Sequence, residues 1–372
     1  MKPDRMPSPF PFLAVAILAL LAGLWAGLMR LGWTLPPITP NLVLMHGPLM
    51  VTGFLATLII LERSVALKLR WTYLPPILAG IGGLTTFLFQ SSNLGPILMT
   101  VAGLGGVAIL GEITRREPAL HTFTMLLGMF ALFVGNLLWL FGKPIFQIVF
   151  IWQAFLILTI IGERLELNRV LRPSQTQRFF FIAILIVLVS GMIYAFFNNQ
   201  IGSRLIGISL ILVAIWSVRF DIAWRNLRHM LPLTRYIAWC LALGFFWLGI
   251  SGVLNVLYGG QIAGPKYDAI VHAVFIGFVI SMIFGHAPII FPAILGVPVF
   301  FQPVFYLQLA LLHTSLILRV YGDLTTNQIV RMWGGLLNEI AILLFLGLTI
   351  YNVRKTWSKN PKLPRKVKYC SN

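Results

Sequence analysis

Ionisable side chains lie inside long apolar stretches of this sequence. The segment "VLMHGPLMVTGFLATLIILERSV" at 43–65 carries His46 near its start and Glu62 near its end. Ionisable groups inside a bilayer are costly and mark functional sites by default. Imidazole and carboxylate groups can bind metal ions or carry protons, so the elements that hold them determine what chemistry is available.

Composition predicts that these elements are membrane-spanning helices. The 372 residues are 58% hydrophobic and 10% charged, with a mean hydropathy of +0.89, far from the values of soluble domains. A spanning helix needs about 20 apolar residues. Twelve runs qualify, near 10–30, 42–62, 73–91, 94–112, 119–141, 144–163, 179–197, 201–218, 234–258, 267–291, 303–321 and 330–352. We expect an all-α polytopic membrane protein with one domain over 1–352 and a basic tail over 353–372.

The net charge of +18 is distributed as in a membrane protein rather than a nucleic-acid-binding one. With twelve spans and both termini inside, 22 of the 28 Lys and Arg residues fall on the inner side. This bias predicts a plasma-membrane protein with both termini cytoplasmic. The basic tail is expected to attract anionic membrane lipids, and no nucleic-acid partner is expected.

Three of the predicted helices align without gaps. "GFLATLIILER" (53–63), "AFLILTIIGER" (154–164) and "GFVISMIFGHA" (277–287) lie four helices apart each time. Equal spacing predicts a triplicated four-helix unit and hence a pseudo-threefold arrangement.

The aligned helices place Glu62, Glu163 and His286 at one position of the repeat. One interpretation is that the Glu-Arg pairs are interfacial ion pairs that close each helix. The other is a carboxylate–carboxylate–histidine cluster, which could hold an inner metal ion such as copper or relay protons.

Two other histidines have the positions of cofactor ligands. His46 and His272 each lie about five residues into an inward-running helix, so they share a depth near the outer face. Paired imidazoles are the usual axial ligands of a low-spin b-type haem. Relative to Gly53 and Gly277, however, His46 lies seven residues before its glycine and His272 five, which in regular helices points them in different directions.

The residues around both histidines resemble subunit I of the haem-copper oxidases. "HGPLM" at 46–50 is similar to the family's H-G-x-x-M, whose histidine is an axial haem ligand, and "DAIVHAVFIGFVISM" at 268–282 is similar to its tenth helix. The tenth helix of the family carries two histidines, and this sequence has Phe275 and Gly277 at those two positions. The resemblance implies a pseudo-threefold bundle of twelve helices and a haem on His46, with His272 as the second ligand.

Further residues extend and limit this resemblance. Arg319 and Arg331 lie in a series similar to the family's loop that holds the haem propionates, although they could be ordinary interfacial arginines. The copper ligands of the oxidases are missing, since the sequence has no histidine between His121 and His229. Oxygen reduction is therefore not implied. The short NnrS-type haem membrane proteins, which are linked to nitric-oxide metabolism, are a closer likeness.

The sequence thus predicts a haem-binding membrane protein related to redox or nitric-oxide chemistry, in contact with lipids and with other subunits of a respiratory complex. A secondary transporter is an alternative, because polar residues such as Asn136, Asn255 and Glu339 lie within apolar runs. A metal-free structural subunit of a membrane complex is another. His229 is expected to be solvent-exposed and His121 to be structural, whereas His313 lies in mid-helix at membrane depth, where a functional role is more plausible but no partner is evident.

Overall fold

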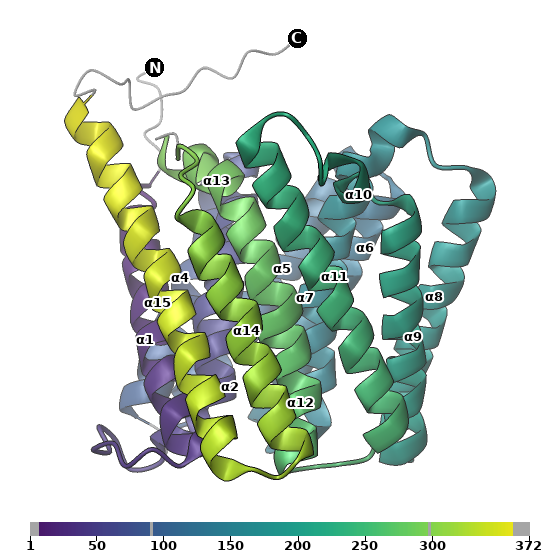
Figure 1. Cartoon of the computed structure of the whole chain (residues 1–372). Helices are drawn as coiled ribbons and strands as arrows, with labels where there is room; N and C mark the ends of the chain where they lie inside the picture. Colours follow the sequence, from purple (N-terminus) through teal and green to yellow (C-terminus); the bar gives the residue numbers. More distant parts are fainter. Residues whose placement is uncertain (1–6, 90–91, 297–298, 360–372) are drawn as a thin grey trace. The chain divides into compact units, whose positions relative to one another are not determined.

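The computed structural model describes residues 7–89, 92–296 and 299–359, and this part of the chain is helical without strands (Figure 1). The N-terminal elements in chain order are α1 (Phe10–Leu31), η1 (Leu42–Met45), α2 (His46–Pro48), η2 (Leu49–Ala56), α3 (Thr57–Leu67), η3 (Arg70–Tyr73), α4 (Leu74–Leu88), α5 (Leu94–Arg116), α6 (Leu120–Leu140), α7 (Ile145–Leu167) and η4 (Asn168–Leu171). They are followed by α8 (Gln175–Ala195), α9 (Asn199–Phe220), α10 (Ala223–Asn226), α11 (Pro232–Tyr258), α12 (Pro265–His272), η5 (Ala273–Ile280), α13 (Ser281–Leu295), α14 (Phe305–Leu324) and α15 (Gln328–Lys359).

The helices confirm an all-α, multi-pass membrane protein. In the described part of the chain, ten helices are long and apolar enough to cross a membrane. The other two predicted spans are also helices but are not among these ten. Helix α4 has 15 residues, fewer than the about 20 that a bilayer core requires. Helix α14 is longer but less apolar, because it carries Gln308, His313 and Arg319.

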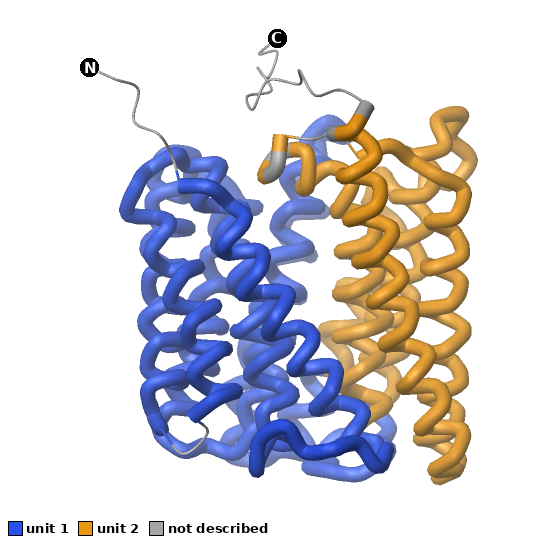
Figure 2. The backbone as a smooth tube through the Cα atoms, turned by 90° about the vertical axis from the view of Figure 1, so that its left-hand side faces the viewer, with its two compact units in different colours: residues 1–206, 255–267 blue, residues 207–254, 268–372 orange. Residues whose placement is uncertain are grey.

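The chain divides into two compact units (Figure 2). Unit 1 comprises residues 1–206 and 255–267, and unit 2 comprises 207–254 and 268–372. The sequence predicted one domain over 1–352. The last helix, α15, continues to Lys359 and so includes the start of the predicted tail, whereas residues 360–372 lie outside the described part.

Helix α7 forms the centre of unit 1. Its buried residues, which include Trp152, Gln153 and Phe155, cover its whole circumference rather than one face. A helix that is apolar all round is one surrounded by other helices. The neighbouring helix α6 packs along it, and Gly128 of α6 allows the close approach, because a Cβ there would lie 2.9 Å from the carbonyl oxygen of Phe155.

Two helices contain π-helical segments at matching places. Segment η2 (Leu49–Ala56) follows His46 after two residues, and η5 (Ala273–Ile280) follows His272 directly. Both segments have eight residues, and Gly53 and Gly277 are each the fifth. π-Helical turns are rare and frequently occur at functional sites. The irregularity therefore falls at one place in two of the three segments that the sequence aligned, while the third, in α7, is regular.

Candidate functional site

His46 is held at the start of its helix by a bond to the backbone of α1. Its Nδ1 lies 2.7 Å from the carbonyl oxygen of Gly23. Because a carbonyl only accepts hydrogen bonds, Nδ1 carries the hydrogen, and in the neutral ring Nε2 carries the lone pair. Metal-binding histidines are oriented in this way, by a bond from the other ring nitrogen to a carbonyl or carboxylate.

A buried polar network supports the helix that carries His46. The indole Nε1 of Trp152 donates to Asn136 Oδ1 at 3.1 Å, and the hydroxyl of Thr52, within η2, donates to the same oxygen at 3.0 Å. Asn136 Nδ2 donates to the carbonyl of Met99 at 3.0 Å. A Cβ built on Gly47 would lie 3.6 Å from the Trp152 ring. Asn136, which suggested a transporter, is therefore a fully buried structural residue beneath the His46 segment.

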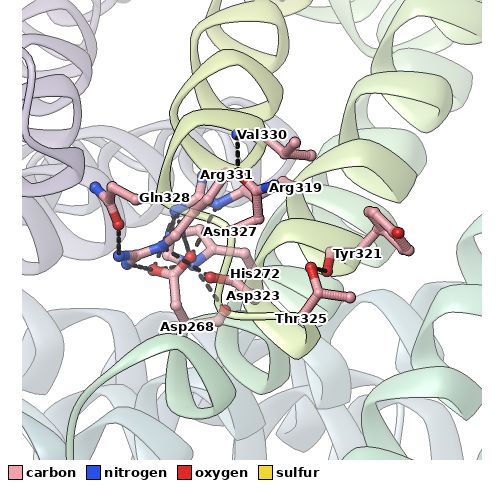
Figure 3. A network of polar contacts seen from close by, with 10 residues as sticks. All are labelled: Asp268, His272, Arg319, Tyr321, Asp323, Thr325, Asn327, Gln328, Val330 and Arg331. Carbon is pink, nitrogen blue, oxygen red and sulfur yellow. Dashed lines mark hydrogen bonds and ion pairs between the residues drawn. The ribbon is translucent and has the colours of Figure 1, made fainter.

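His272 belongs to a network of charged side chains in unit 2, shown in Figure 3. Its Nδ1 lies 3.0 Å from the backbone carbonyl of Asp268 and 3.2 Å from Asp268 Oδ1, so Nδ1 again carries the hydrogen. Arg319 binds the same carboxylate through two bonds, Nε to Oδ2 at 2.9 Å and Nη2 to Oδ1 at 3.1 Å. This fork-to-fork geometry is the strong form of an arginine–carboxylate pair.

A second arginine and a second carboxylate complete the network. Arg331 Nε lies 2.7 Å from Asp323 Oδ1, and its Nη2 lies 3.6 Å from Asp268 Oδ1. The Asp323 side chain is fully buried, and the Arg319 side chain is 7% exposed. Two carboxylates thus balance two guanidinium groups, as buried charges require. The sequence singled out both arginines but did not pair them with Asp268 or Asp323.

Two glycines set the position of the arginines. A Cβ at Gly334 of α15 would lie 2.4 Å from the backbone nitrogen of Arg319, and a Cβ at Gly322 of α14 would lie 2.5 Å from the backbone nitrogen of Arg331. Each glycine therefore allows the backbone of one arginine on the other helix to approach closely. Small residues at helix contacts permit such close approach in membrane proteins. The sequence does not distinguish these two glycines from the other glycines of the chain, which has 33 in all.

The contact between Arg319 and His272 bears directly on ligand binding. Arg319 Nη2 lies 3.3 Å from both ring nitrogens of His272. Since Nδ1 donates to Asp268, only the Nε2 lone pair can accept from the guanidinium. In this arrangement the atom that would bind a metal faces a cation.

The predicted inner carboxylates are joined by an arginine. Arg63 of α3 donates to Glu163 of α7, and its Nη2 lies 3.8 Å from Glu62. The sequence associated Arg63 only with its neighbour Glu62. The third predicted member, His286, belongs to unit 2, where its Nδ1 lies 2.7 Å from the Met282 carbonyl. Among the described residues, no group of three or more His, Cys, Asp or Glu side chains is arranged to hold a metal ion.

His313 has a structural role that its sequence position alone did not define. The indole of Trp247 donates to its Nδ1 at 3.0 Å, so Nε2 carries the hydrogen and donates to Ser281 Oγ at 3.2 Å. The Ser281 hydroxyl donates onward to the carbonyl of Cys240 at 2.7 Å. Both ring nitrogens are therefore committed to a buried network. It resembles the Trp152–Asn136–Thr52 network, because in each an indole and a hydroxyl bond one polar side chain.

The remaining two histidines lie near helix ends. His121, at the start of α6, is buried with Nε2 3.7 Å from Glu117 Oε1. His229 lies in the connection between α10 and α11, where its Nδ1 accepts from the backbone nitrogen of Leu231 at 3.1 Å.

The chain matches one known family model over most of its length. The model of a family described as "Domain of unknown function (DUF8744)" matches residues 9–354. The chain belongs to this family. The match covers every site residue described above, from His46 to Arg331, so these residues lie within the DUF8744 domain. No curated protein matches the chain.

Proposed function

We propose that this DUF8744 protein is a haem-binding integral membrane protein, with His46 and His272 as axial ligands of a b-type haem. The observation that carries the proposal is the matched environment of the two histidines. Each precedes an eight-residue π-helical segment with glycine at its fifth position, and each donates from Nδ1 to a backbone carbonyl. Both rings are thereby set to use Nε2 as the ligating atom.

The side chains present are compatible with haem. Two imidazoles with Nε2 lone pairs form the usual donor set of a low-spin b-type haem. Arg319 and Arg331 already bind carboxylates, those of Asp268 and Asp323, and propionates are carboxylates too. Bound haem would supply one-electron redox chemistry. The protein's own residues would orient the ligands and neutralise the propionates.

Ligation by His272 requires a change in one contact. Arg319 Nη2 lies 3.3 Å from His272 Nε2, so the guanidinium must leave this lone pair for iron to bind it. The Asp268 carboxylate stays beside Nδ1 and keeps the ring oriented. Arg319 thus has two roles in the proposal, a partner of His272 without haem and a partner of a propionate with it.

We also propose the number of spans, their arrangement and the orientation of the protein in the membrane. Twelve spans in a pseudo-threefold arrangement, with both termini cytoplasmic in the plasma membrane, would follow the haem-copper oxidase resemblance. The positive-inside distribution of Lys and Arg supports the orientation. Membrane lipids and other subunits of a respiratory complex are the proposed partners, and redox or nitric-oxide chemistry is the proposed context. The Arg63–Glu163 contact favours the ion-pair interpretation of the inner carboxylates over an inner metal site.

Haem content tests the proposal. Wild-type protein and the variants His46→Ala, His272→Ala and His229→Ala would be purified from haem-replete cells and assayed as pyridine haemochrome. We expect haem in wild type and in His229→Ala, whose histidine lies in a connection, and a loss of about tenfold or more in the other two variants. Folded wild-type protein without a Soret band would overturn the proposal.

A secondary transporter is the second candidate. The Asp268–Arg319–Asp323–Arg331 network favours it, because buried charges in membrane helices often lie on substrate or ion pathways. The two candidates differ in their dependence on His46, which lies in unit 1 and outside this network. Transport that persists in His46→Ala, by protein that contains no haem, would favour the transporter.

A further inference from the structure

A small pocket in unit 2 has one polar wall and several aromatic ones. It lies between α13, α14 and α15, at the end of α14 opposite to Arg319. Its lining includes Phe284, Phe291, Phe305 and Phe345, together with Gln308 and Thr349. The rings of Phe284 and Phe345 stack with centroids 4.4 Å apart and form part of the wall.

Gln308 brings an unsatisfied polar atom to this pocket. Its side chain is 2% exposed, and its Nε2 donates to the hydroxyl of Tyr236 at 3.2 Å. Within the described ranges no side chain or backbone group donates to Gln308 Oε1. A buried acceptor without a donor costs about 1–3 kcal/mol, so native proteins supply one, often as water.

Two prolines release further acceptors nearby. Pro288 and Pro292 lie inside α13 and have no N–H group. The carbonyls of Phe284 and Pro288, four residues earlier, therefore lose their usual helical donors, and both residues line the pocket. The pocket thus combines the Gln308 amide and the Thr349 hydroxyl with residues of α13 whose carbonyls lack the usual helical donor.

We propose that this pocket binds one ordered water molecule, held by Gln308 and the Thr349 hydroxyl and bridging α14 to α15. The cavity volume is about 10 Å³, close to the about 10–15 Å³ that one water requires. Water both donates and accepts, so it satisfies the Gln308 amide in either orientation. The pocket offers no carboxylate to a metal cation, since none of the lining residues is Asp or Glu. The water site is independent of haem binding.

A structure of the wild-type protein in a nanodisc, at a resolution that shows ordered water, tests the proposal. We expect a density peak within hydrogen-bonding distance, about 2.7–3.2 Å, of both the Gln308 amide and Thr349 Oγ1. A wild-type pocket that shows no such peak, at a resolution where other buried waters are seen, overturns the proposal.

Thr349→Val keeps the shape of the side chain and removes its hydroxyl. The variant should therefore fold, and any change can be assigned to the lost hydroxyl. We expect the water peak to be lost and the melting temperature to fall by a few degrees. The matched control is Thr314→Val on α14, whose exposed hydroxyl bonds the Ala310 carbonyl of its own helix at 2.8 Å. An unchanged or raised melting temperature in Thr349→Val, together with a retained peak, would show that Thr349 does not hold the water.

Discussion

Arg319 and Asp268 form a two-bond ion pair between α14 and α12, with donor–acceptor distances of 2.9 and 3.1 Å. The pair is largely buried, and Asp268 also orients His272. One carboxylate therefore connects a helix-packing contact to the candidate ligand, and its loss should affect both.

Replacement of Asp268 by Asn should destabilise the protein strongly. Removing one partner leaves Arg319 buried beside an uncharged group, which typically costs about 3–5 kcal/mol. Thermal unfolding in detergent measures the effect. The control is Arg115→Lys in the exposed Glu112–Arg115 pair, which should change little. Equal, small shifts in both variants would show that the Asp268 network contributes little to stability.

A methyl group at Gly334 should separate α14 from α15. Its Cβ would lie 2.4 Å from the Arg319 backbone nitrogen, and such overpacking costs about 1–3 kcal/mol or more. Gly347→Ala, on the same helix with nothing within 4 Å of its Cβ, is the matched control. Because alanine favours helix by about 1 kcal/mol, that control should be neutral or stabilising. Comparable unfolding temperatures for the two variants would contradict the close packing at Gly334.

Asn136→Leu should disturb the segment that presents His46. The substitution leaves the indole N–H of Trp152 and the hydroxyl of Thr52 without their shared acceptor, at a cost of about 1–3 kcal/mol. Thr52→Val removes one bond and should cost less, since side-chain bonds between membrane helices average about 0.6 kcal/mol. Unfolding monitored by tryptophan fluorescence gives both values. A larger loss in Thr52→Val than in Asn136→Leu would be inconsistent with Asn136 as the hub.

His313→Ala should lower stability without affecting haem. Its two ring nitrogens bond Trp247 and Ser281, so the variant loses a buried network but no proposed ligand. We expect a reduced melting temperature and an unchanged ratio of haem to protein, measured on the same preparation. A loss of haem that exceeds the loss of folded protein would instead make His313 part of the haem site.

The sequence predicted the helices better than their contacts. Apolar runs of sufficient length specify helices in a membrane, because only internal hydrogen bonds satisfy the backbone there. Within the described residues each predicted run overlaps a helix, but α4 is too short and α14 too polar to be among the ten helices that could cross a membrane. The π-helical segments η2 and η5 were not predicted, since they depend on how side chains pack and leave no pattern in composition.

The sequence identified individual residues of the candidate site but not which residues contact one another. Arg319 and Arg331 were candidates for holding haem propionates or for ordinary interfacial arginines, and the structure pairs them instead with Asp268 and Asp323. The partner of Glu163 was missed, because Arg63 is 100 residues away in the chain. The pairing of His46 with His272, the repeat of four-helix units and the bound haem stay predictions.

Low-temperature EPR of the oxidised, purified protein reports directly on whether His46 and His272 ligate a haem iron. Haem iron bound by two imidazoles is low-spin, so wild type should give a low-spin ferric signal. His46→Ala and His272→Ala should each lose that signal, with any remaining haem high-spin, whereas His313→Ala should retain it. A wild-type protein without a ferric haem signal, or a low-spin signal unchanged in both ligand variants, would show that His46 and His272 do not ligate haem.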